Sequence, residues 1–357
     1  MEKLKACVLG ATGAAGQNIV EYLWDHPWFE ISSLAASERS SGMSYSDAIR
    51  RAVFFYEPPG QDVLEMKVSA VDRLNPKEFD LAFSALPSSV AKVVEPRFAE
   101  HTPVFSTASA YRYEGDVPVI ISEVNPEHIG LIDVQRRLRG WKGYICPGPN
   151  CSAVGLTMTL KPIHDAFGVR AVHMVSMQSL SGAGEKGLRK DSEYRRSAEM
   201  NVLPYIEDEE EKVQRETNKI LGEFVGERIV EAGINIHCSC NRVYVENVHT
   251  EVVYLDTDRE CTISEVKEVL RSFKGEPQRL KLPLAPEKPI LVFDEEDMPQ
   301  PKLHLEYGGM VTLVGRVRRD TVFRNGVTYV LTSHNTDKGA GGGAVLTAEH
   351  LKAKGYL

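Results

Sequence analysis

The segment GATGAAG at residues 10–16 is the feature that most restricts the possible fold of this chain. It follows an apolar run at residues 4–9 and precedes a segment whose apolar spacing is typical of a helix. Gly10 can turn the chain sharply, Gly13 lets backbone N–H groups approach a pyrophosphate, and Gly16 permits close packing of strand and helix. An ordinary strand–helix turn is the alternative, but the position after the first strand favours a dinucleotide site. The predicted cofactor residues here are Gly10, Thr12, Gly13, Ala14 and Ala15.

Strand-like runs alternate with helical segments over the first 150 residues. This alternation predicts an α/β fold whose first domain, residues 1–150, contains a Rossmann-type doubly wound parallel sheet. Besides residues 4–9, the strand-like runs span residues 29–37, 63–70, 79–87 and 102–109.

The pattern changes after that point in the chain. Longer alternating runs at 169–180, 234–255 and 310–320 are typical of antiparallel strands with one exposed face. We therefore predict a second domain of mixed α/β structure over residues 151–334. The tail, residues 335–357, reads as a glycine turn and a helix, which we expect to complete the first domain.

Composition excludes several classes of protein. The chain has 357 residues, a net charge of −8 and six cysteines, and it lacks the roughly 18 consecutive apolar residues of a membrane span. The acidic balance argues against nucleic-acid binding. With few cysteines and no signal-peptide pattern, we expect reduced thiols and a cytoplasmic protein. No metal site is expected, because His237, Cys238 and Cys240 have no second pair at zinc-like spacing.

The end of the second predicted strand bears on the choice between NAD and NADP. An acidic residue that binds ribose would favour NAD, but the sequence there is AASERSSG. Ser37, Arg39 and Ser40 offer two hydroxyls and a guanidinium to a 2′-phosphate, which favours NADP. A polar loop with a solvated arginine is the alternative.

Cys151 lies in the segment PGPNCSAVG, at the predicted junction of the two domains. A cysteine at the start of a helix has a stabilised thiolate, so we expect the pKa of this thiol to fall. A buried structural cysteine is the alternative for an isolated residue. Here the upstream cofactor pattern favours a nucleophile.

Several further segments carry a resemblance to a known family. The chain resembles the aspartate-semialdehyde dehydrogenases, most closely their archaeal and fungal branch. The matching segments run in family order over nearly the whole chain. They are GATGAAGQ, AASERSSG, FSALPS, SAYRYEGDVPVIISEVN, PNCS, SMQSLSGAG, NVLPYIEDEEEKVQRETNKILG, CNRVYVENVHTE and HNTDKGAGGGAVL.

The resemblance implies a role for each matching residue. Cys151 would be the nucleophile that forms an acyl thioester, His249 the acid/base, and Gln178 the residue that orients the acyl group. The implied substrate-binding residues are Arg112, Asn150 and Lys212 for phosphate, Glu209 for the amino group, and Arg242 for the α-carboxylate. Further implied cofactor contacts are Ser84, Ser181, Gly182 and Asn335.

Two of these assignments carry a geometric condition. Glu209 and Lys212 share a helix face, and without the resemblance a solvated salt bridge is the simpler reading. Arg242 and His249 are seven residues apart, so a bend must intervene if both side chains line one site.

The implied reaction is reduction of L-aspartyl 4-phosphate by NADPH to L-aspartate 4-semialdehyde and phosphate, in the biosynthesis of lysine, threonine and methionine. The second domain would be catalytic and would form a homodimer or homotetramer. The alternatives are an acyl-CoA reductase, such as a malonyl-CoA reductase, and a non-catalytic NADP-binding sensor. Val248, Tyr244 and the charged segment at 185–200 depart from the family pattern and bear on the identity of the substrate.

Overall fold

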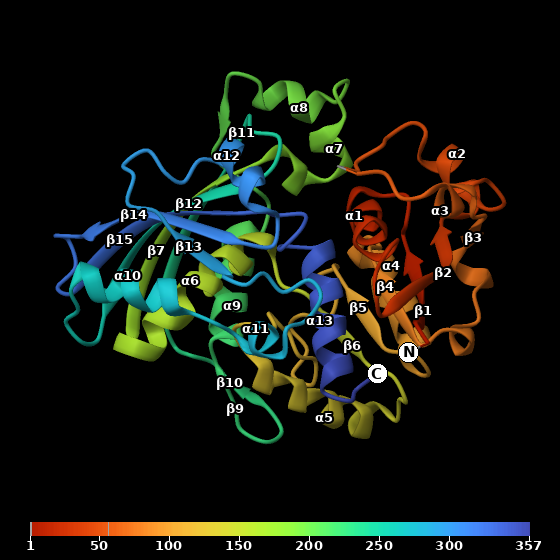
Figure 1. Cartoon of the computed structure of the whole chain (residues 1–357), viewed down its shortest axis with the longest axis horizontal. Helices are drawn as coiled ribbons and strands as arrows, with labels where there is room; N and C mark the ends of the chain where they lie inside the picture. Colours follow the sequence, from red (N-terminus) through yellow and green to blue (C-terminus); the bar gives the residue numbers. More distant parts are fainter. Residues whose placement is uncertain (1, 56) are drawn as a thin grey trace.

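The computed structural model describes residues 2–55 and 57–357, and it places two sheets side by side (Figure 1). The first sheet has six strands in the order β3-β2-β1-β4-β5-β6, and every neighbouring pair is parallel. This order is that of a Rossmann fold and confirms the predicted doubly wound sheet. Its strands are β1 (Leu4–Leu9), β2 (Phe29–Ala36), β3 (Val68–Ala70), β4 (Leu81–Ser84), β5 (Val104–Ser106) and β6 (Ile145–Pro147).

Helices cover both faces of the first sheet, because its strands are apolar on both sides. In β1, Ala6 and Val8 pack toward α1 and α5, whereas Cys7 and Leu9 pack toward α4. Short helices fill the connections. The helices of this region are α1 (Ala14–Leu23), α2 (Tyr45–Ile49), α3 (Gln61–Glu65), α4 (Ser88–Ala99) and α5 (Leu131–Arg139), with the 3-10 turns η1 (Glu38–Ser40), η2 (Val71–Arg73), η3 (Pro76–Glu78) and η4 (Pro126–Gly130).

The second sheet has seven strands in the order β13-β14-β15-β12-β7-β11-β8. Most of its pairs are antiparallel, as predicted for the runs after residue 150, but β11 runs parallel to β7 and β13 parallel to β14, which was not predicted. Its strands are β7 (Val169–Gln178), β8 (Val202–Leu203), β11 (Asn235–Val243), β12 (His249–Thr257), β13 (Ile290–Val292), β14 (Thr312–Arg319) and β15 (Gly326–Ser333), and β9 (Glu223–Phe224) pairs separately with β10 (Ile229–Val230).

One face of the second sheet is covered by helices, and alternate strand residues point into the resulting core. Val172 and Met174 of β7 lie in that core, while His173 between them is exposed on the other face. The covering helices are α6 (Cys151–Phe167), α9 (Glu209–Ile220) and α10 (Ile263–Ser272). Shorter elements at the periphery are η5 (Leu180–Ala183), α7 (Glu185–Leu188), α8 (Glu193–Ala198), α11 (Glu276–Leu280), α12 (Pro301–His304) and η6 (Leu305–Tyr307).

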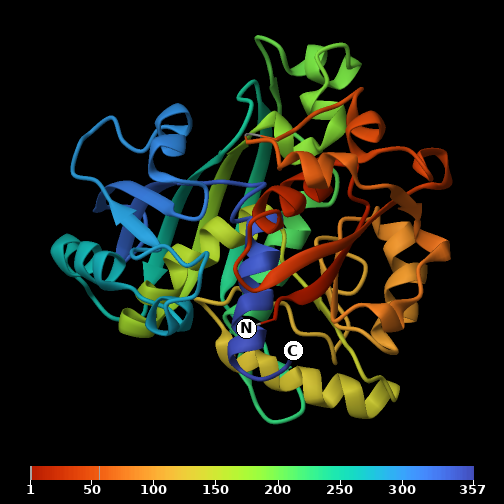
Figure 2. The ribbon, with the colours of Figure 1, turned by 45° about the vertical axis from the view of Figure 1, so that its right-hand side comes forward.

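The C-terminal helix, α13 (Gly341–Ala353), lies between the two sheets and alongside α1, as both ribbon views show (Figures 1 and 2). Val345, Ala348 and Leu351 of this helix are buried in the core of the first sheet. The loop before α13 therefore passes through the junction of the two sheets. Within residues 2–55 and 57–357, no helix is long and apolar enough to cross a membrane.

Two details of the secondary structure differ from the prediction. The run at 63–70 is not one strand, because α3 takes its first residues and only Val68–Ala70 pairs with β2. Strands β6, β13 and β15 and the two-residue strands β8, β9 and β10 were not predicted. Three residues are too few to show a period, which explains the omission of β6.

Candidate active site

The glycine turn lies where the carboxyl ends of the parallel strands meet. Gly10 follows β1 with φ of +79°, and an added Cβ would come within 2.6 Å of the Ala85 carbonyl oxygen. Gly16 sits over the turn, where a Cβ would approach the Gly10 carbonyl oxygen to 2.1 Å. At Gly13, the N-cap of α1, the nearest atom to an added Cβ is 3.7 Å away. Gly10 and Gly16 therefore allow the turn to close tightly, and Gly13 leaves the outer side of the turn accessible.

Thr12, Ala14 and Ala15 are half-buried around the start of α1. Ser84 ends β4 and is fully buried. Of the residues predicted to contact a cofactor in the first domain, Ser84 is thus the least accessible.

The predicted 2′-phosphate residues lie just past β2. Ser37 is the N-cap of η1, and both Ser37 and Arg39 are exposed, while Ser40 is half-buried. Glu38, the acidic residue in this segment, forms an ion pair with Arg73.

Cys151 is the first residue of α6, as predicted. Asn150 is the N-cap, and its Oδ1 accepts hydrogen bonds from the backbone N–H groups of Ser152 and Ala153 at 2.9 and 3.2 Å. The cap fixes the start of the helix and hence the direction of the Cys151 side chain. Because Oδ1 is used by the cap, only the Nδ2 group of Asn150 remains to bind an anion.

His249, the first residue of β12, lies beside the cysteine, with its Nε2 atom 3.3 Å from the Cys151 Sγ atom. Its Nδ1 atom is 3.1 Å from both the backbone nitrogen and the Oγ atom of Ser179. The Ser179 hydroxyl donates in turn to the Asn335 Oδ1 atom at 3.0 Å, and Asn335 also contacts Ser181. The sequence-predicted pair is therefore brought together, with Ser179 as an additional member.

Burial controls the protonation of this pair. Burial, with a smaller contribution from Glu209, raises the pKa of Cys151 to about 12, although Arg242 and Arg112 act in the opposite direction. Burial and the nearby Arg242 hold the pKa of His249 well below its usual range. The prediction that the pKa of Cys151 falls was wrong, because burial is the largest influence on this thiol and raises its pKa.

Arg242 and His249 reach one site because they belong to different strands. Strand β7 lies between β11 and β12, so Arg242 at the end of β11 and His249 at the start of β12 flank the end of β7. An added Cβ at Gly182 would come within 2.7 Å of Arg242 Nη1 and 2.8 Å of His249 Cε1, so both side chains pack on this glycine. The Arg242 Nη1 group also donates to the Ser179 carbonyl oxygen at 2.5 Å. The bend that was predicted between Arg242 and His249 is therefore the connection from β11 to β12.

Gln178 ends β7 and joins the nucleophile helix to α9. Its Nε2 group donates to Ser152 Oγ and to Glu209 Oε1, both at 2.9 Å. Glu209 is the first residue of α9, and Lys212 is half-buried one turn later, where its Nζ atom lies 3.7 Å from the Asp208 carboxylate. The two residues predicted to bind substrate therefore share one end of a helix that faces the cysteine.

A cavity of about 220 Å³ is lined by eight of the predicted residues, which come from the cofactor, substrate and catalytic sets. It lies between the start of α1 and the start of α6, and Gln178, Glu209, Lys212, Arg242 and His249 stand outside its lining. The predicted residues that line it are Ala14, Ala15, Arg112, Asn150, Cys151, Ser181, Gly182 and Asn335.

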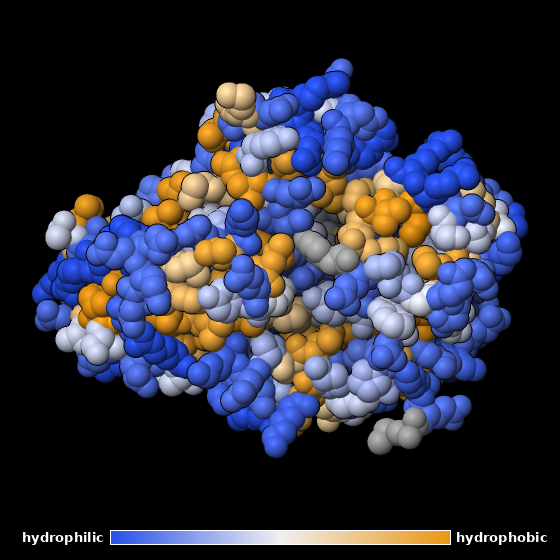
Figure 3. Space-filling view, turned by 45° about the horizontal axis from the view of Figure 1, so that its top comes forward, coloured by the Kyte–Doolittle hydropathy of each residue, from blue (hydrophilic) through white to orange (hydrophobic). Residues whose placement is uncertain are grey.

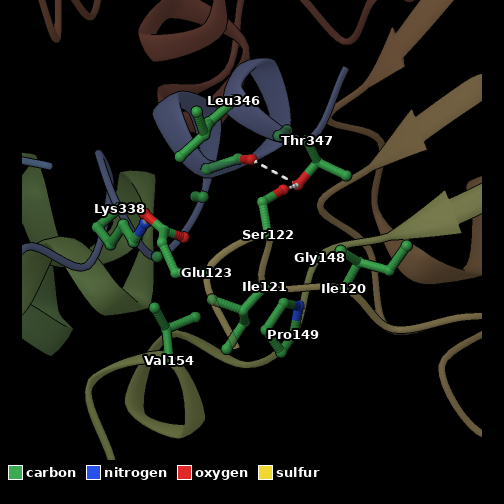
Figure 4. A pocket seen from close by; sticks show the side chains of 14 residues that line it. Ile120, Ile121, Ser122, Glu123, Gly148, Pro149, Val154, Lys338, Leu346 and Thr347 are labelled. Carbon is green, nitrogen blue, oxygen red and sulfur yellow. Dashed lines mark hydrogen bonds and ion pairs between the residues drawn. The ribbon is translucent and has the colours of Figure 1, made fainter. Parts of the chain in front are cut away.

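The loop before α13 is tied down behind this cavity. Lys338 forms a fully buried ion pair with Glu123. The pair lines a cavity of about 20 Å³ together with apolar side chains such as Val154 and Leu346 and the hydroxyl groups of Ser122 and Thr347 (Figure 4). That space holds about one water molecule and is too small for a substrate. An added Cβ at Gly339 would come within 2.8 Å of the Cys151 Cβ atom, so this ion pair holds the loop against the nucleophile.

The three departures from the family pattern lie near the site. Tyr194, in the charged segment, accepts a hydrogen bond from Arg242 Nε at 3.2 Å, and Arg195 stacks over Tyr244. Val248 is fully buried with φ of +74°, a strained conformation for a β-branched residue, and its N–H donates to Asn335 Oδ1. Figure 3 shows the face that carries the charged segment as largely hydrophilic, with a hollow near its centre.

Four residues that hold the site together were not predicted as site residues. They are Ser179, Glu216, and the pair Glu123 and Lys338. Glu216 had a usable signal, because it follows Glu209 and Lys212 on the same face of one helix. Glu123 and Lys338 each lie in a segment that matches the family, but nothing in the sequence shows that these two residues, 215 positions apart, form a pair.

Comparison with known proteins agrees with this geometry. A family model for the NAD binding domain of semialdehyde dehydrogenases matches residues 5–132, and one for their dimerisation domain matches residues 160–338. An aspartate-semialdehyde dehydrogenase from Methanothermobacter thermautotrophicus is 45% identical over 96% of this chain and 97% of its own length.

This chain belongs to the aspartate-semialdehyde dehydrogenase family.

Two further comparisons place it within the family. The structure of an aspartate-semialdehyde dehydrogenase from Candida albicans, solved with NADP, matches with a TM-score of 0.88 and 34% identity over all of both chains. A malonyl CoA reductase (NADP) from Metallosphaera sedula is 38% identical over 99% of this chain and 98% of its own length. Aspartate-semialdehyde dehydrogenases and one acyl-CoA reductase thus share this scaffold, and the archaeal and fungal relatives fit the predicted branch.

Proposed function

We propose that this protein catalyses the NADPH-dependent reduction of L-aspartyl 4-phosphate to L-aspartate 4-semialdehyde and phosphate, through a thioester on Cys151. The reaction belongs to amino-acid biosynthesis. Support comes from relatives of 45% identity with this name and from the site geometry. The single observation that carries the proposal is that Arg112 lines the same cavity as Cys151, since a buried guanidinium beside a nucleophile suits a phosphate leaving group.

The residues present fit a dinucleotide. The glycine turn leaves backbone accessible at Gly13, and the catalytic cavity extends from Ala14 and Ala15 to Cys151. We assign the 2′-phosphate to Ser37, Arg39 and Ser40, and the nicotinamide half to residues that include Ser181, Gly182 and Asn335. Bound NADPH supplies the hydride in this site.

Cys151 acts as the nucleophile. Its sulfur attacks the acyl carbon, the bond from carbon to the phosphate oxygen breaks, and phosphate leaves with that electron pair, which produces a thioester. Arg112, Lys212 and the Nδ2 group of Asn150 hold the leaving phosphate. After reduction, the thiohemiacetal on Cys151 breaks its carbon–sulfur bond, and the semialdehyde departs as the thiol re-forms.

His249 moves the protons of these steps. The thiol is neutral in the resting site, so its proton must pass to His249 Nε2 as the sulfur attacks. That transfer needs the imidazole tautomer that carries its hydrogen on Nδ1, and the Ser179 hydroxyl can accept a hydrogen bond from this N–H. In the tautomer with its hydrogen on Nε2, Nδ1 instead accepts a hydrogen bond from the backbone N–H of Ser179. Ser179 therefore provides a partner for either tautomer of the histidine.

The remaining contacts orient the amino acid. Glu209 offers a carboxylate to its amino group, and Arg242 offers a guanidinium to its α-carboxylate. Gln178 is held by Ser152 and Glu209, which fixes its amide beside the acyl group. A sensor that only binds NADP would need none of these side chains.

Acceptor selectivity tests the proposal. The assay follows NADPH formation from L-aspartate 4-semialdehyde and NADP with phosphate, arsenate or CoA. We expect turnover that depends on phosphate or arsenate and is absent with CoA alone. Turnover with CoA and not with phosphate would contradict the proposal and favour an acyl-CoA reductase. Tight binding of NADP without any turnover would favour a sensor.

We also propose that the protein assembles as a homodimer or homotetramer through the uncovered face of the second sheet. The dimerisation-domain match spans that sheet, and exposed His173 and His237 lie there beside half-buried Val175 and Met177. Light scattering of the purified protein tests this, and a monomer would contradict it. We place the protein in the cytoplasm, since Cys151 must remain a reduced thiol.

A further inference from the structure

We propose that Glu216 is a positioning residue that joins the phosphate-binding arginine to the nucleophile helix. This inference rests on the proposed function. It concerns a residue that stands outside the cavity lining and cannot touch the reacting atoms itself.

Glu216 is buried and uses its two carboxylate oxygens in different directions. Its Oε1 atom accepts from Arg112 Nη1 at 3.2 Å and from the Tyr113 hydroxyl at 3.0 Å. Its Oε2 atom accepts from the backbone N–H of Asn150 at 2.5 Å. One carboxylate thus fixes both the guanidinium assigned to phosphate and the residue that caps the helix of Cys151.

The chemistry of these contacts requires a carboxylate. The groups around Glu216 are all donors, so each oxygen must accept, and a carboxylate has two acceptor atoms. An amide of the same shape presents one acceptor and one N–H₂ group. In Glu216→Gln, the amide N–H₂ group must therefore face either Arg112 or the backbone N–H of Asn150, both of which are donors. The hydrogen bond on that side is lost.

The helix that carries Glu216 also holds the backbone of the arginine. Lys219, one turn further along α9, donates to the carbonyl oxygens of Arg112, Glu114 and Val117 at 2.7–3.0 Å. Burial lowers the pKa of Lys219 to about 8. Helix α9 therefore presents Glu209 and Lys212 to the substrate at its first turns and anchors the Arg112 segment at its later turns. The placement of phosphate relative to the thiol depends on one rigid element.

The test uses two readouts, one of which needs no turnover. Inorganic phosphate is expected to slow alkylation of Cys151 by iodoacetamide, because it binds at Arg112 beside the sulfur. In Glu216→Gln the half-protecting phosphate concentration should rise about tenfold or more, from loss of one charge-assisted hydrogen bond. The KM for phosphate in the NADPH-forming assay should rise by a similar factor, with the KM for NADP unchanged.

Two further variants separate positioning from a general defect. Glu349 is a matched control for Glu216, because it is also a buried carboxylate. It accepts hydrogen bonds from the His26 ring and from the backbone N–H of Leu284. Glu349→Gln should leave phosphate protection unchanged. Tyr113→Phe removes one of the three bonds and keeps the carboxylate, so it should raise the half-protecting concentration only a fewfold.

The outcomes distinguish this inference from the proposed function. If phosphate protects the unaltered protein and Glu216→Gln equally, or if Glu216→Gln weakens NADP as much as phosphate, the positioning role is overturned and the proposed function stands. If phosphate neither protects the unaltered protein nor supports turnover, the proposed function fails, and this inference fails with it.

Discussion

The cofactor half and the substrate half of the site are built in different ways. The centre of the cofactor half is a short contiguous turn, residues 10–16, in which glycines shape the backbone at the edge of a parallel sheet, and residues such as Arg39 and Asn335 add to it from other segments. The substrate half is a set of side chains from separate segments of the chain, held by buried ion pairs and hydrogen bonds. Its members include Arg112, Cys151, Gln178, Glu209, Arg242 and His249.

This difference has consequences for specificity. A backbone site binds a dinucleotide in many enzymes and says little about the reaction, whereas the side-chain set fixes which acyl group and which leaving group are accepted. Substitutions in the substrate half should therefore abolish chemistry and spare cofactor binding, and substitutions at the 2′-phosphate residues should do the reverse.

The largest expected effect is that of Cys151→Ser. Without the thiol, no thioester forms, and turnover should fall by roughly four orders of magnitude or more. The dissociation constant for NADP, measured by fluorescence titration, should stay within about twofold of its original value, because binding uses other groups. A parallel loss of NADP binding would show that the two halves are not separable in this way.

The next effect concerns pH. Because burial raises the pKa of Cys151 to about 12, the thiol is protonated at neutral pH and the thiolate fraction grows as pH rises. The rate of alkylation by iodoacetamide should increase about tenfold per pH unit between pH 6 and 9, as expected for a group far below its pKa. Cys151→Ser corrects for the other cysteines, which are all buried. A plateau near pH 7 would instead indicate a thiolate–imidazolium pair.

A smaller effect is expected in the cofactor half. Arg39→Ala should raise the KM for NADP about tenfold and leave that for NAD unchanged, through loss of a charge-assisted bond to the 2′-phosphate. Arg137→Ala removes an exposed arginine elsewhere, one paired with Glu227, and serves as the control for net charge. Equal loss of affinity for both cofactors would refute the assignment.

The smallest effect is expected at the charged segment. Tyr194→Phe removes the hydroxyl that accepts from Arg242 Nε, which should raise the KM for semialdehyde about two- to fivefold. The KM for NADP should not change. An unchanged KM for semialdehyde would mean that the Ser179 carbonyl oxygen alone is enough to hold Arg242.

The predictable parts of this molecule are those encoded locally. Strand β1, the glycine turn and helix α1 follow from one stretch of sequence, and the helix start at Cys151 follows from its Pro-Asn cap. Run 63–70 was assigned wrongly because a short apolar segment suits either helix or strand. Strand β15 was missed although its β-branched residues carry a strand signal.

The rest of the site depends on tertiary structure. Arg242 and His249 meet because β7 lies between their strands, which spacing along the chain cannot show. The protonation of Cys151 depends on how much protein surrounds the sulfur, so reasoning from the helix N-terminus gave the wrong direction. Glu216 was within reach of helical periodicity, but its partners Arg112 and Asn150 lie 104 and 66 residues away.

The proposed reaction requires that Cys151 carries the acyl group and that phosphate releases it. The most direct test is mass spectrometry of the intact protein after incubation with L-aspartate 4-semialdehyde and NADP in the absence of phosphate. We predict one aspartyl adduct, located on Cys151 by peptide mapping, that disappears when phosphate is added and persists when CoA is added. No adduct, an adduct at another residue, or discharge by CoA and not by phosphate would contradict the account.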